Sequence, residues 1–206
     1  MKYTQIPSDT FQKLMMNAGV LVDDFTPATG VIGNIIGATS GGITFNATPE
    51  FTDFGEDIDN APKNTMELKK QTDITVTASG TFVTVDASMV QLLAGAADTS
   101  IVSGTTDVSK ITPRKDLATT DFKDLWLVGD YSDKNGDTNG GFVAIHMMNV
   151  LSTGGFAVTT SDGAKDTFGF TFTGHYSIDA PDTVPYEVFV KAGGAEVVGA
   201  TGVTGA

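Results

Sequence analysis

The spacing of apolar and polar positions along the chain predicts a protein built mainly from β-strands. Residues 43–48, 74–82 and 168–178 alternate between apolar and polar side chains, the period of two that a strand requires. Such alternation is typical of antiparallel strands with one face against a core and a polar outer face. The clearest example places five large side chains on one face: Phe168, Phe170, Phe172, Tyr176 and Ile178. Shorter apolar runs predict further strands at 20–22, 125–128, 142–150 and 186–190.

Residues 8–19 have the pattern of an amphipathic helix instead. Ser8, Asp9 and Thr10 offer capping oxygens, and Gly19 is suitably placed to end the helix. One helical face would carry the apolar side chains, namely Phe11, Leu14, Met15 and Ala18. We therefore expect a helix of about three turns packed on its own domain.

Residues 86–95 predict a second short helix. Asp86 or Ser88 can cap its first turn, and Gln91 would complete a capping box with Ser88. Met89, Leu92 and Leu93 supply the apolar face, and Gly95 follows them. The expected fold class is thus mainly β: an antiparallel β-sandwich or barrel with one or two flanking α-helices.

Length and composition fit a single folded domain. The chain has 206 residues, shows no internal repeat and has no linker long enough to divide it. We expect one domain over residues 1–191, followed by a tail rich in Gly, Ala and Val over 192–206. There are no cysteines, so disulfides and thiolate metal sites are excluded.

The net charge of the chain indicates which partners it can bind. The chain has 12 basic and 25 acidic residues, a formal net charge of −13. Affinity for nucleic acid depends on basic side chains that neutralise phosphates, so specific DNA binding is not expected. A wall past which DNA slides without sticking remains compatible with this charge. No signal-peptide core follows residues 1–7, and the uncharged stretch 25–49 is too polar to span a membrane, so we expect folding in a cytoplasm.

The segment from about 50 to 70 differs from the rest in polarity. Its first ten residues contain five acids and no base, interleaved with three large apolar side chains, and three lysines come next. A long polar excursion between strands is uncommon in a compact domain unless it has a role. The candidate interface residues are Glu50, Phe51, Asp53, Phe54, Glu56, Asp57, Ile58, Asp59, Lys63, Lys69 and Lys70.

No constellation in the sequence predicts catalysis or a cofactor. His146 lies in an apolar strand and His175 on the threonine side of another, and neither is near a nucleophile elbow. Residues 37–42 resemble a phosphate loop but lack the lysine, which favours a glycine-rich turn between strands. Residues 133–140 imitate a calcium loop, yet Thr138 and Ala144 stand where the required glycine and glutamate belong, which favours a hairpin turn. We expect no enzyme, no cofactor and no metal.

Four stretches, taken in order, resemble the major tail (tail tube) proteins of siphophages and related prophages. They are Gly41–Glu50, Lys69–Thr77, Asp86–Leu93 leading into Gly95, and Phe168–Tyr176. The order of strand, long loop, strand, helix and late aromatic strand is similar to that family over nearly the whole chain. The combination and its order carry the resemblance.

The resemblance implies a structural subunit that self-assembles into stacked, hexameric rings, with DNA passing through the lumen without specific binding. It implies that the 50–70 segment contacts neighbouring subunits or the next ring. It also implies other partners (tape measure, tail terminator and distal tail proteins), no membrane anchoring, and a place in the virion tail after assembly in the bacterial cytoplasm. Two alternatives stay open: the tube of a contractile tail or phage-derived particle, and a β-sandwich surface module that binds glycans or calcium.

Overall fold

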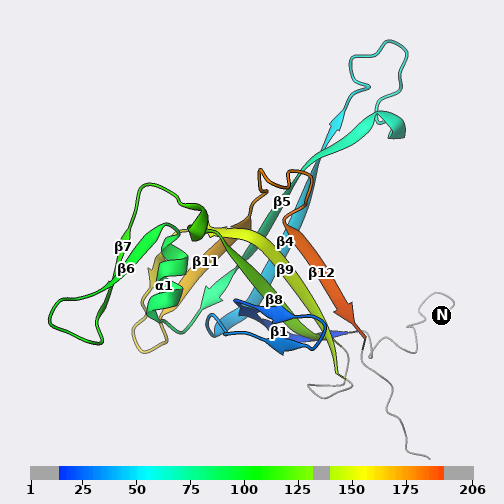
Figure 1. Cartoon of the computed structure of the whole chain (residues 1–206). Coiled ribbons are helices and arrows are strands. Elements are labelled where there is room, and N and C mark those ends of the chain that lie inside the picture. Colours follow the sequence, from blue (N-terminus) through cyan, green and yellow to red (C-terminus); the bar gives the residue numbers. More distant parts are fainter. Residues whose placement is uncertain (1–13, 132–139, 193–206) are drawn as a thin grey trace, which may run out of the picture.

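The computed structural model describes residues 14–131 and 140–192. The described part is mainly β, with antiparallel strands and one α-helix, which confirms the predicted fold class (Figure 1). In chain order the elements are β1 (Met15–Val22), β2 (Phe25–Thr26), β3 (Val31–Ile32), β4 (Thr39–Asp53), the 3₁₀ turn η2 (Met66–Leu68), β5 (Lys69–Phe82), α1 (Ala87–Ala94), β6 (Ala97–Ile101), β7 (Ser109–Pro113), the 3₁₀ turn η3 (Thr119–Asp121), β8 (Lys123–Tyr131), β9 (Gly141–Ser152), β10 (Ala157–Thr159), β11 (Thr167–Gly174) and β12 (Tyr186–Lys191). No helix in these two ranges is long and apolar enough to cross a bilayer.

The main sheet consists of two halves joined through one strand. One half has the order β1-β8-β9-β12, and the other has the order β4-β5-β11-β10. The end of β9 pairs with β11 at Leu151 and Ser152, which makes the two halves one eight-stranded sheet. Every strand pair is antiparallel, as the alternating sequence pattern predicts.

The main hydrophobic core lies between the two halves and beneath α1. Phe82 and Phe172 come from one half and Leu125 and Met147 from the other, and all four are almost completely buried. The helix adds two buried side chains, Met89 and Leu93. Burial of each large apolar side chain contributes about 1.5–3 kcal/mol, so this shared cluster is the main source of stability.

The helix α1 confirms the second helical prediction. The Asp86 carboxylate caps it by accepting a 2.7 Å hydrogen bond from the Met89 N–H and a 2.6 Å bond from the Ser88 hydroxyl. These two bonds, the hydroxyl first, hold the pKa of Asp86 below its usual value. The Ser88–Gln91 box does not form, since the Gln91 side chain donates to the Ala97 carbonyl.

The predicted helix over residues 8–19 is wrong where the structure describes it. Residues 1–13 lie outside the described ranges, and from Met15 the chain is strand β1, paired with β8. Asn17 and Gly19 have positive φ values of 75° and 70°, which form a bulge that no helix accommodates. At Gly19 a Cβ atom would lie 3.1 Å from the Val128 carbonyl oxygen, so the close approach of β8 selects glycine here. Pairing between distant strands overrides the local helical pattern.

Two smaller expectations also need correction. The glycine-rich segment 37–42 is not a turn between strands, because β4 already begins at Thr39. Gly41 and Gly42, both at φ 82°, lie where the β4–β5 register shifts. The late aromatic strand ends at Gly174 rather than continuing to 178, so Tyr176 and Ile178 lie outside it and are exposed.

Candidate assembly surface

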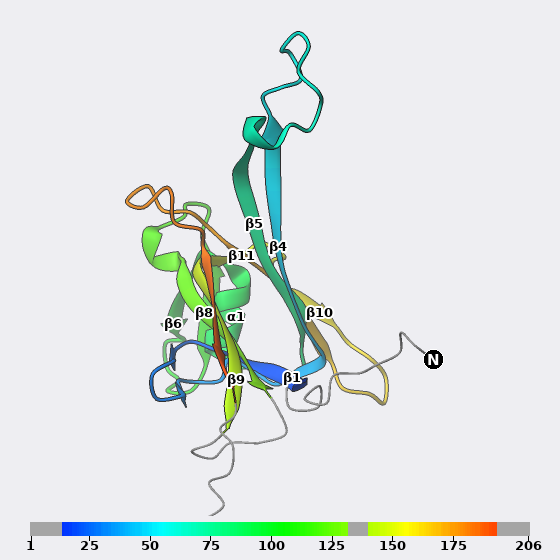
Figure 2. The ribbon, with the colours of Figure 1, turned by 90° about the vertical axis from the view of Figure 1, so that its right-hand side faces the viewer.

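Strands β4 and β5 continue well beyond the body of the protein as a projecting hairpin, here called the arm (residues 48–73). Figure 2 shows it rising away from the two halves of the sheet. The last residue of β5 that pairs with β11 is Val76, so between Lys69 and Thr75 β5 has only β4 beside it. Residues 48–52 and 69–73 are exposed on both faces. The arm is therefore a two-stranded ribbon without a core of its own.

Large apolar side chains are exposed along this arm. Phe51, Phe54, Ile58 and Met66 each expose between 50% and 80% of their surface. Single exposed apolar residues are ordinary, but four on one thin element without a core are a docking surface more often than a stable solvated one. An isolated two-stranded hairpin is marginal in water, which adds to the need for a partner.

The tip of the arm is closed by one carboxylate. Asp53 Oδ1 accepts a hydrogen bond from the Gly55 N–H and Oδ2 accepts one from the Asn64 N–H, both at 2.9 Å. These two bonds, that of Gly55 first, lower the pKa of the Asp53 carboxyl, and Lys69 and Lys63 act in the same direction. The ends of the tip loop are thus held together although the loop is long.

Backbone conformation and packing complete the tip. Asn60 and Asn64 have φ values of 64° and 60°, a conformation that asparagine tolerates better than most residues. A Cβ on Gly55 would lie 3.0 Å from Leu68 Cδ1, so glycine allows Leu68 to cover it. The Phe54 N–H donates to the Leu68 carbonyl at 2.9 Å, which extends the ladder past the strand ends. The tip therefore has a defined shape within one chain.

The structure brings all eleven predicted interface residues onto the arm. Glu50, Phe51 and Asp53 lie on β4, Lys69 and Lys70 on β5, and the remaining six in the tip. The Lys69 ammonium lies 5.4 Å from the centre of the Phe51 ring, within range of a cation–π contact. The segment is a strand as far as Asp53 and again from Lys69, so the loop proper is shorter than the 50–70 expected.

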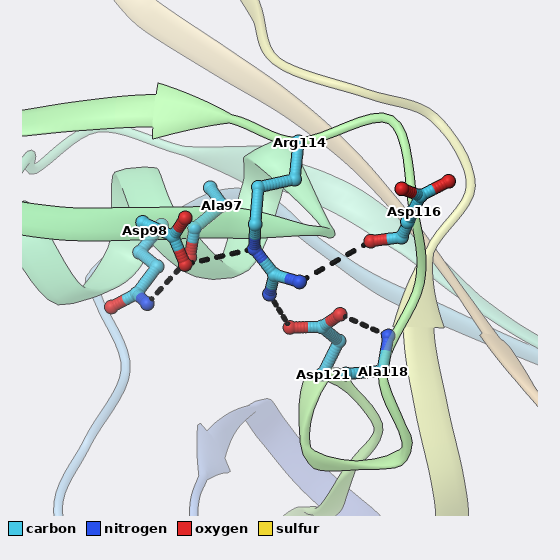
Figure 3. A network of polar contacts seen from close by, with 7 residues as sticks. Ala97, Asp98, Arg114, Asp116, Ala118 and Asp121 are labelled. Carbon is cyan, nitrogen blue, oxygen red and sulfur yellow. Dashed lines mark hydrogen bonds and ion pairs between the residues drawn. The ribbon is translucent and has the colours of Figure 1, made fainter.

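A second, smaller hairpin is formed by β6 and β7, which pair only with each other within the described ranges. Its apolar tip is also exposed, at Ile101, Val102 and Val108. Unlike the arm, it is attached to the body by a charged group at its base. We call that group the Arg114 hub (Figure 3).

The Arg114 guanidinium holds together three segments of chain. Its Nε forms a 2.8 Å ion pair with Asp98 of β6, and its Nη2 pairs with Asp121 of η3. Nη1 donates to the Asp116 carbonyl at 3.2 Å. Asp121 in turn accepts a 2.7 Å bond from the Ala118 N–H, and its side chain is only 8% exposed. The hub fixes the direction in which β6–β7 leaves the body.

A groove of about 1010 Å³ lies beside this hub, between α1, the β2–β3 region and the start of β8. Three of its carboxylates are engaged in structural bonds: Asp23 accepts from the Asn34 N–H and side-chain amide, Asp124 accepts from the Asn149 N–H, and Asp121 pairs with Arg114. These bonds position the loops around the groove.

Both histidines have structural surroundings. The His146 ring stacks on Trp126 at a centroid distance of 4.0 Å, with Asp124 and Glu187 carboxylates 3.4 and 3.8 Å from its two nitrogens. His175 Nδ1 lies 3.0 Å from the Asn149 carbonyl oxygen. Residues 14–131 and 140–192 contain no group of three or more His, Asp or Glu side chains arranged so that they could hold a metal ion. The calcium-like segment 133–140 and the tail from 193 onward lie almost wholly outside the described residues.

Sequence reasoning missed several residues of this surface. Met66, the most exposed of the four apolar arm residues, follows the acidic stretch and shows no periodicity. The β6–β7 hairpin was not predicted, although the Ser103–Gly104 turn dipeptide directly after the apolar pair Ile101–Val102 was a usable signal. Tyr176 was assigned to a core face and lies instead at the root of the arm, 3.1 Å from the Ile74 nitrogen.

Comparisons with known proteins give one distant structural similarity. No family model and no curated protein matches the sequence. Among solved structures the chain is similar to one from the tail of an empty GTA particle, determined by helical refinement with C6 symmetry. The two chains are 10% identical and superpose with a TM-score of 0.39, covering 79% of this chain and 96% of that chain. A similarity at this level assigns no function, and the geometry of this chain has to carry any proposal.

Proposed function

We propose that this protein is a structural subunit of a phage or phage-derived tail, which self-assembles into stacked, hexameric rings that form a tube for DNA. The arm is the observation that carries the proposal. It projects from the body, exposes Phe51, Phe54, Ile58 and Met66, and has a tip whose shape is already fixed by Asp53. In a repeating assembly such an element would lie against the next copy, where its exposed apolar side chains would be buried.

Sheet edges give a second reason. Among the described residues β4 is an outer strand over its whole length from Thr39 to Asp53. β12 is an outer strand of the other half, with Val188 and Val190 50% and 62% exposed. Unpaired edges invite strands of other chains, and a closed ring removes them by head-to-tail contact. The resemblance of four sequence stretches to tail tube proteins supports the same assignment.

Charge supports a role around DNA without binding to it. The whole chain carries a net charge of −13, and the arm has seven acidic residues against three lysines. An acidic wall repels phosphates, which lets a nucleic acid move along a channel without adhering. Tape measure, terminator and distal tail proteins remain further partners within this proposal.

The test is assembly of the purified full chain over a range of concentration and salt. Sedimentation velocity and negative-stain electron microscopy should reveal rings or tubes of uniform width with sixfold symmetry. A species that stays monomeric under all these conditions, and that is absent from particles of its host's phage, would overturn the proposal. A contracted sheath around the tube in such particles would favour the contractile-tail alternative over the siphophage one.

The surface-module alternative makes the opposite prediction. A glycan- or calcium-binding module would remain monomeric and give a saturable heat signal with an oligosaccharide panel or with Ca²⁺ in calorimetry. We expect a flat titration for both, since three carboxylates of the groove, Asp23, Asp124 and Asp121, already accept structural hydrogen bonds.

A further inference from the structure

The direction of the arm depends on its root, where β5 loses one of its two neighbours. β11 pairs with β5 as far as Gly174 opposite Val76, and its chain then turns away. The next N–H of β5 on that side belongs to Ile74. It donates to a side-chain oxygen instead of a backbone carbonyl: the Tyr176 hydroxyl, at 3.1 Å. The tyrosine therefore takes the place that a further residue of β11 would have held.

Tyr176 leaves a firmly held stretch of backbone. The preceding residue, His175, donates its N–H to the Met148 carbonyl and places Nδ1 3.0 Å from the Asn149 carbonyl oxygen. The Asn149 side chain donates back to the His175 carbonyl at 3.1 Å. Asn149 has a φ of 49°, and its own N–H is bound by Asp124. The contacts between His175 and Asn149 thus fix the position of the backbone from which Tyr176 extends toward β5; this pair of residues is called the seat of the tyrosine.

Apart from Tyr176, which also has Asp73 of the arm beside its hydroxyl, the arm is joined to the body through the continuing strands β4 and β5. Among the described residues the strands of the arm pair with each other, and Thr48 and Pro49 continue the ladder to Thr75 and Ile74 of the body. The register of β4 and β5 shifts between Glu50 and Phe51. A bulge of this kind bends and twists a strand. Burial, together with the nearby Asp73, raises the pKa of Tyr176, so its hydroxyl stays protonated at neutral pH. The Tyr176 contact therefore adds to the β4–β5 ladder in resisting rotation of the arm about its root.

We infer that Tyr176 is the positioning residue of the arm: its hydroxyl, seated by His175 and Asn149, fixes the angle at which the arm leaves the body. This inference rests on the proposed function for its biological meaning, since a fixed angle matters where the arm meets the next subunit. The contact itself can be tested on the free subunit. The Ile74 N–H also lies 2.7 Å from Asp73 Oδ1, so removal of the tyrosine hydroxyl leaves that donor with a partner and the fold intact.

The test is Tyr176→Phe, with Tyr186→Phe as the matched control. The Tyr186 side chain packs on Phe45, and its hydroxyl has no hydrogen bond to the described part of the chain. Because the chain has no cysteine, Glu56→Cys at the tip and Val190→Cys on β12 give a unique pair for nitroxide labels. Pulsed electron paramagnetic resonance on the monomer then reports the spread of arm angles.

We expect a narrow distance distribution in the parent and in Tyr186→Phe, and a broadened one in Tyr176→Phe. Amide hydrogen exchange at Ile74 should accelerate up to about tenfold, the factor expected from losing one ordinary hydrogen bond, with β8 and β9 unchanged. His175→Ala should broaden the distribution as well, since it removes the seat. In the assembly assay, Tyr176→Phe should slow tube formation without changing the melting midpoint.

The results distinguish a failure of the positioning role of Tyr176 from a failure of the proposed tail-tube function. If the distribution and the Ile74 exchange rate are the same in Tyr176→Phe as in the parent, the positioning role is wrong, whatever the state of assembly. A broadening in His175→Ala alone would overturn it too, because the backbone seat and not the hydroxyl would then hold the arm. If the parent never assembles while Tyr176→Phe still broadens the distribution, the positioning role holds and the tail-tube function falls.

Discussion

The arm and the β6–β7 hairpin are both two-stranded ribbons with exposed apolar tips, but they are attached to the body in different ways. The arm is an extension of strands that lie in the main sheet, and at its root the Ile74 N–H donates to the Tyr176 hydroxyl. The shorter hairpin has no strand in the main sheet and is anchored by the ion pairs of Arg114.

The two attachments predict that the smaller hairpin contributes to the stability of the subunit and that the arm contributes to association between subunits. Loss of the arm beyond its root removes no buried side chain of the core, so the body should fold without it. Loss of the Arg114 hub, in contrast, leaves the nearly buried Asp121 carboxylate without its partner, and that cost falls on the folding of the subunit. We therefore expect the subunit to fold without the arm, whereas the attachment of the smaller hairpin contributes to the stability of the subunit.

The largest expected effect comes from shortening the arm. Residues 54–68 replaced by Asn-Gly would join Asp53 and Lys69, which are already paired, through a two-residue turn. We expect a folded monomer with an unchanged circular dichroism spectrum and cooperative melt, and a complete loss of tubes in negative stain. The matched control replaces residues 102–108 by Asn-Gly between the paired Ile101 and Ser109, and should retain tubes. Normal tubes from the shortened arm would show that the segment is not an assembly element.

The second effect concerns stability alone. Arg114→Met keeps the length of the side chain but strips the hub of its charge, and should lower the free energy of unfolding by about 1–3 kcal/mol because Asp121 loses its counter-ion. Urea denaturation followed by Trp126 fluorescence measures this. Lys115→Met, on the exposed neighbour, should stay within about 0.5 kcal/mol of the parent. Equal effects of the two substitutions would contradict an anchoring role for the hub.

Polar substitutions at the two tips test whether the exposed apolar side chains of the arm, and not those of the β6–β7 hairpin, take part in assembly. The double change Phe54→Ser and Ile58→Ser should leave the melt within about 0.5 kcal/mol of the parent, because both side chains are at least half exposed. It should raise the critical concentration for assembly by about tenfold or more. Full burial of one such side chain contributes roughly 1.5–3 kcal/mol, and since only about half of each is exposed, the pair together would lose about that amount. Light scattering against concentration gives this value. Ile101→Ser with Val102→Ser is the control, and a larger shift there would reverse the roles of the two hairpins.

The smallest effect is local and depends on pH. The pKa of Asp53 is lowered in the folded tip, so its contribution is present above the unfolded value of about 3.9 and is lost as pH falls through the folded pKa. The amide resonances of Gly55 and Asn64 should keep their shifts down to about pH 4 and move together below it. In Asp53→Asn they should differ from the parent already at neutral pH. Independent titration of the two amides would show that one carboxylate does not close the tip.

The strands of the fold were predictable where alternation is strict. Residues 43–48 and 74–82 face the core and solvent as their sequence indicates, and α1 begins at the predicted cap. The predicted helix at 8–19 was wrong because the conformation of Asn17 and Gly19 is set by their pairing with β8, more than a hundred residues away in the sequence. No local sequence pattern indicates that pairing. Likewise Tyr176 continues the alternation of β11 in sequence, yet the chain has already turned at Gly174 against Pro185 and Met148.

The candidate surface was predictable in composition but not in shape. Five acids with interleaved apolar residues marked the arm, since charge density opposes burial. Its extension as a ribbon depends on cross-strand pairs such as Thr52 with Lys70, which have no signature in either strand alone. The Arg114 hub was invisible for the same reason: its three partners come from segments before and after it, and each looks like an ordinary surface acid or loop.

The continuity of β5 from tip to core has a mechanical consequence. A pull along the arm's long axis would be carried by β5 into the pairing with β4 and with β11, where the hydrogen bonds lie across the direction of force and are loaded simultaneously. Through β11 the load passes to β9 at Leu151 and Ser152, and so to the other half of the sheet. In a filament made of such subunits, stretching would load all the hydrogen bonds of a strand pair together in shear, and would not break them one after another from the end of the strand.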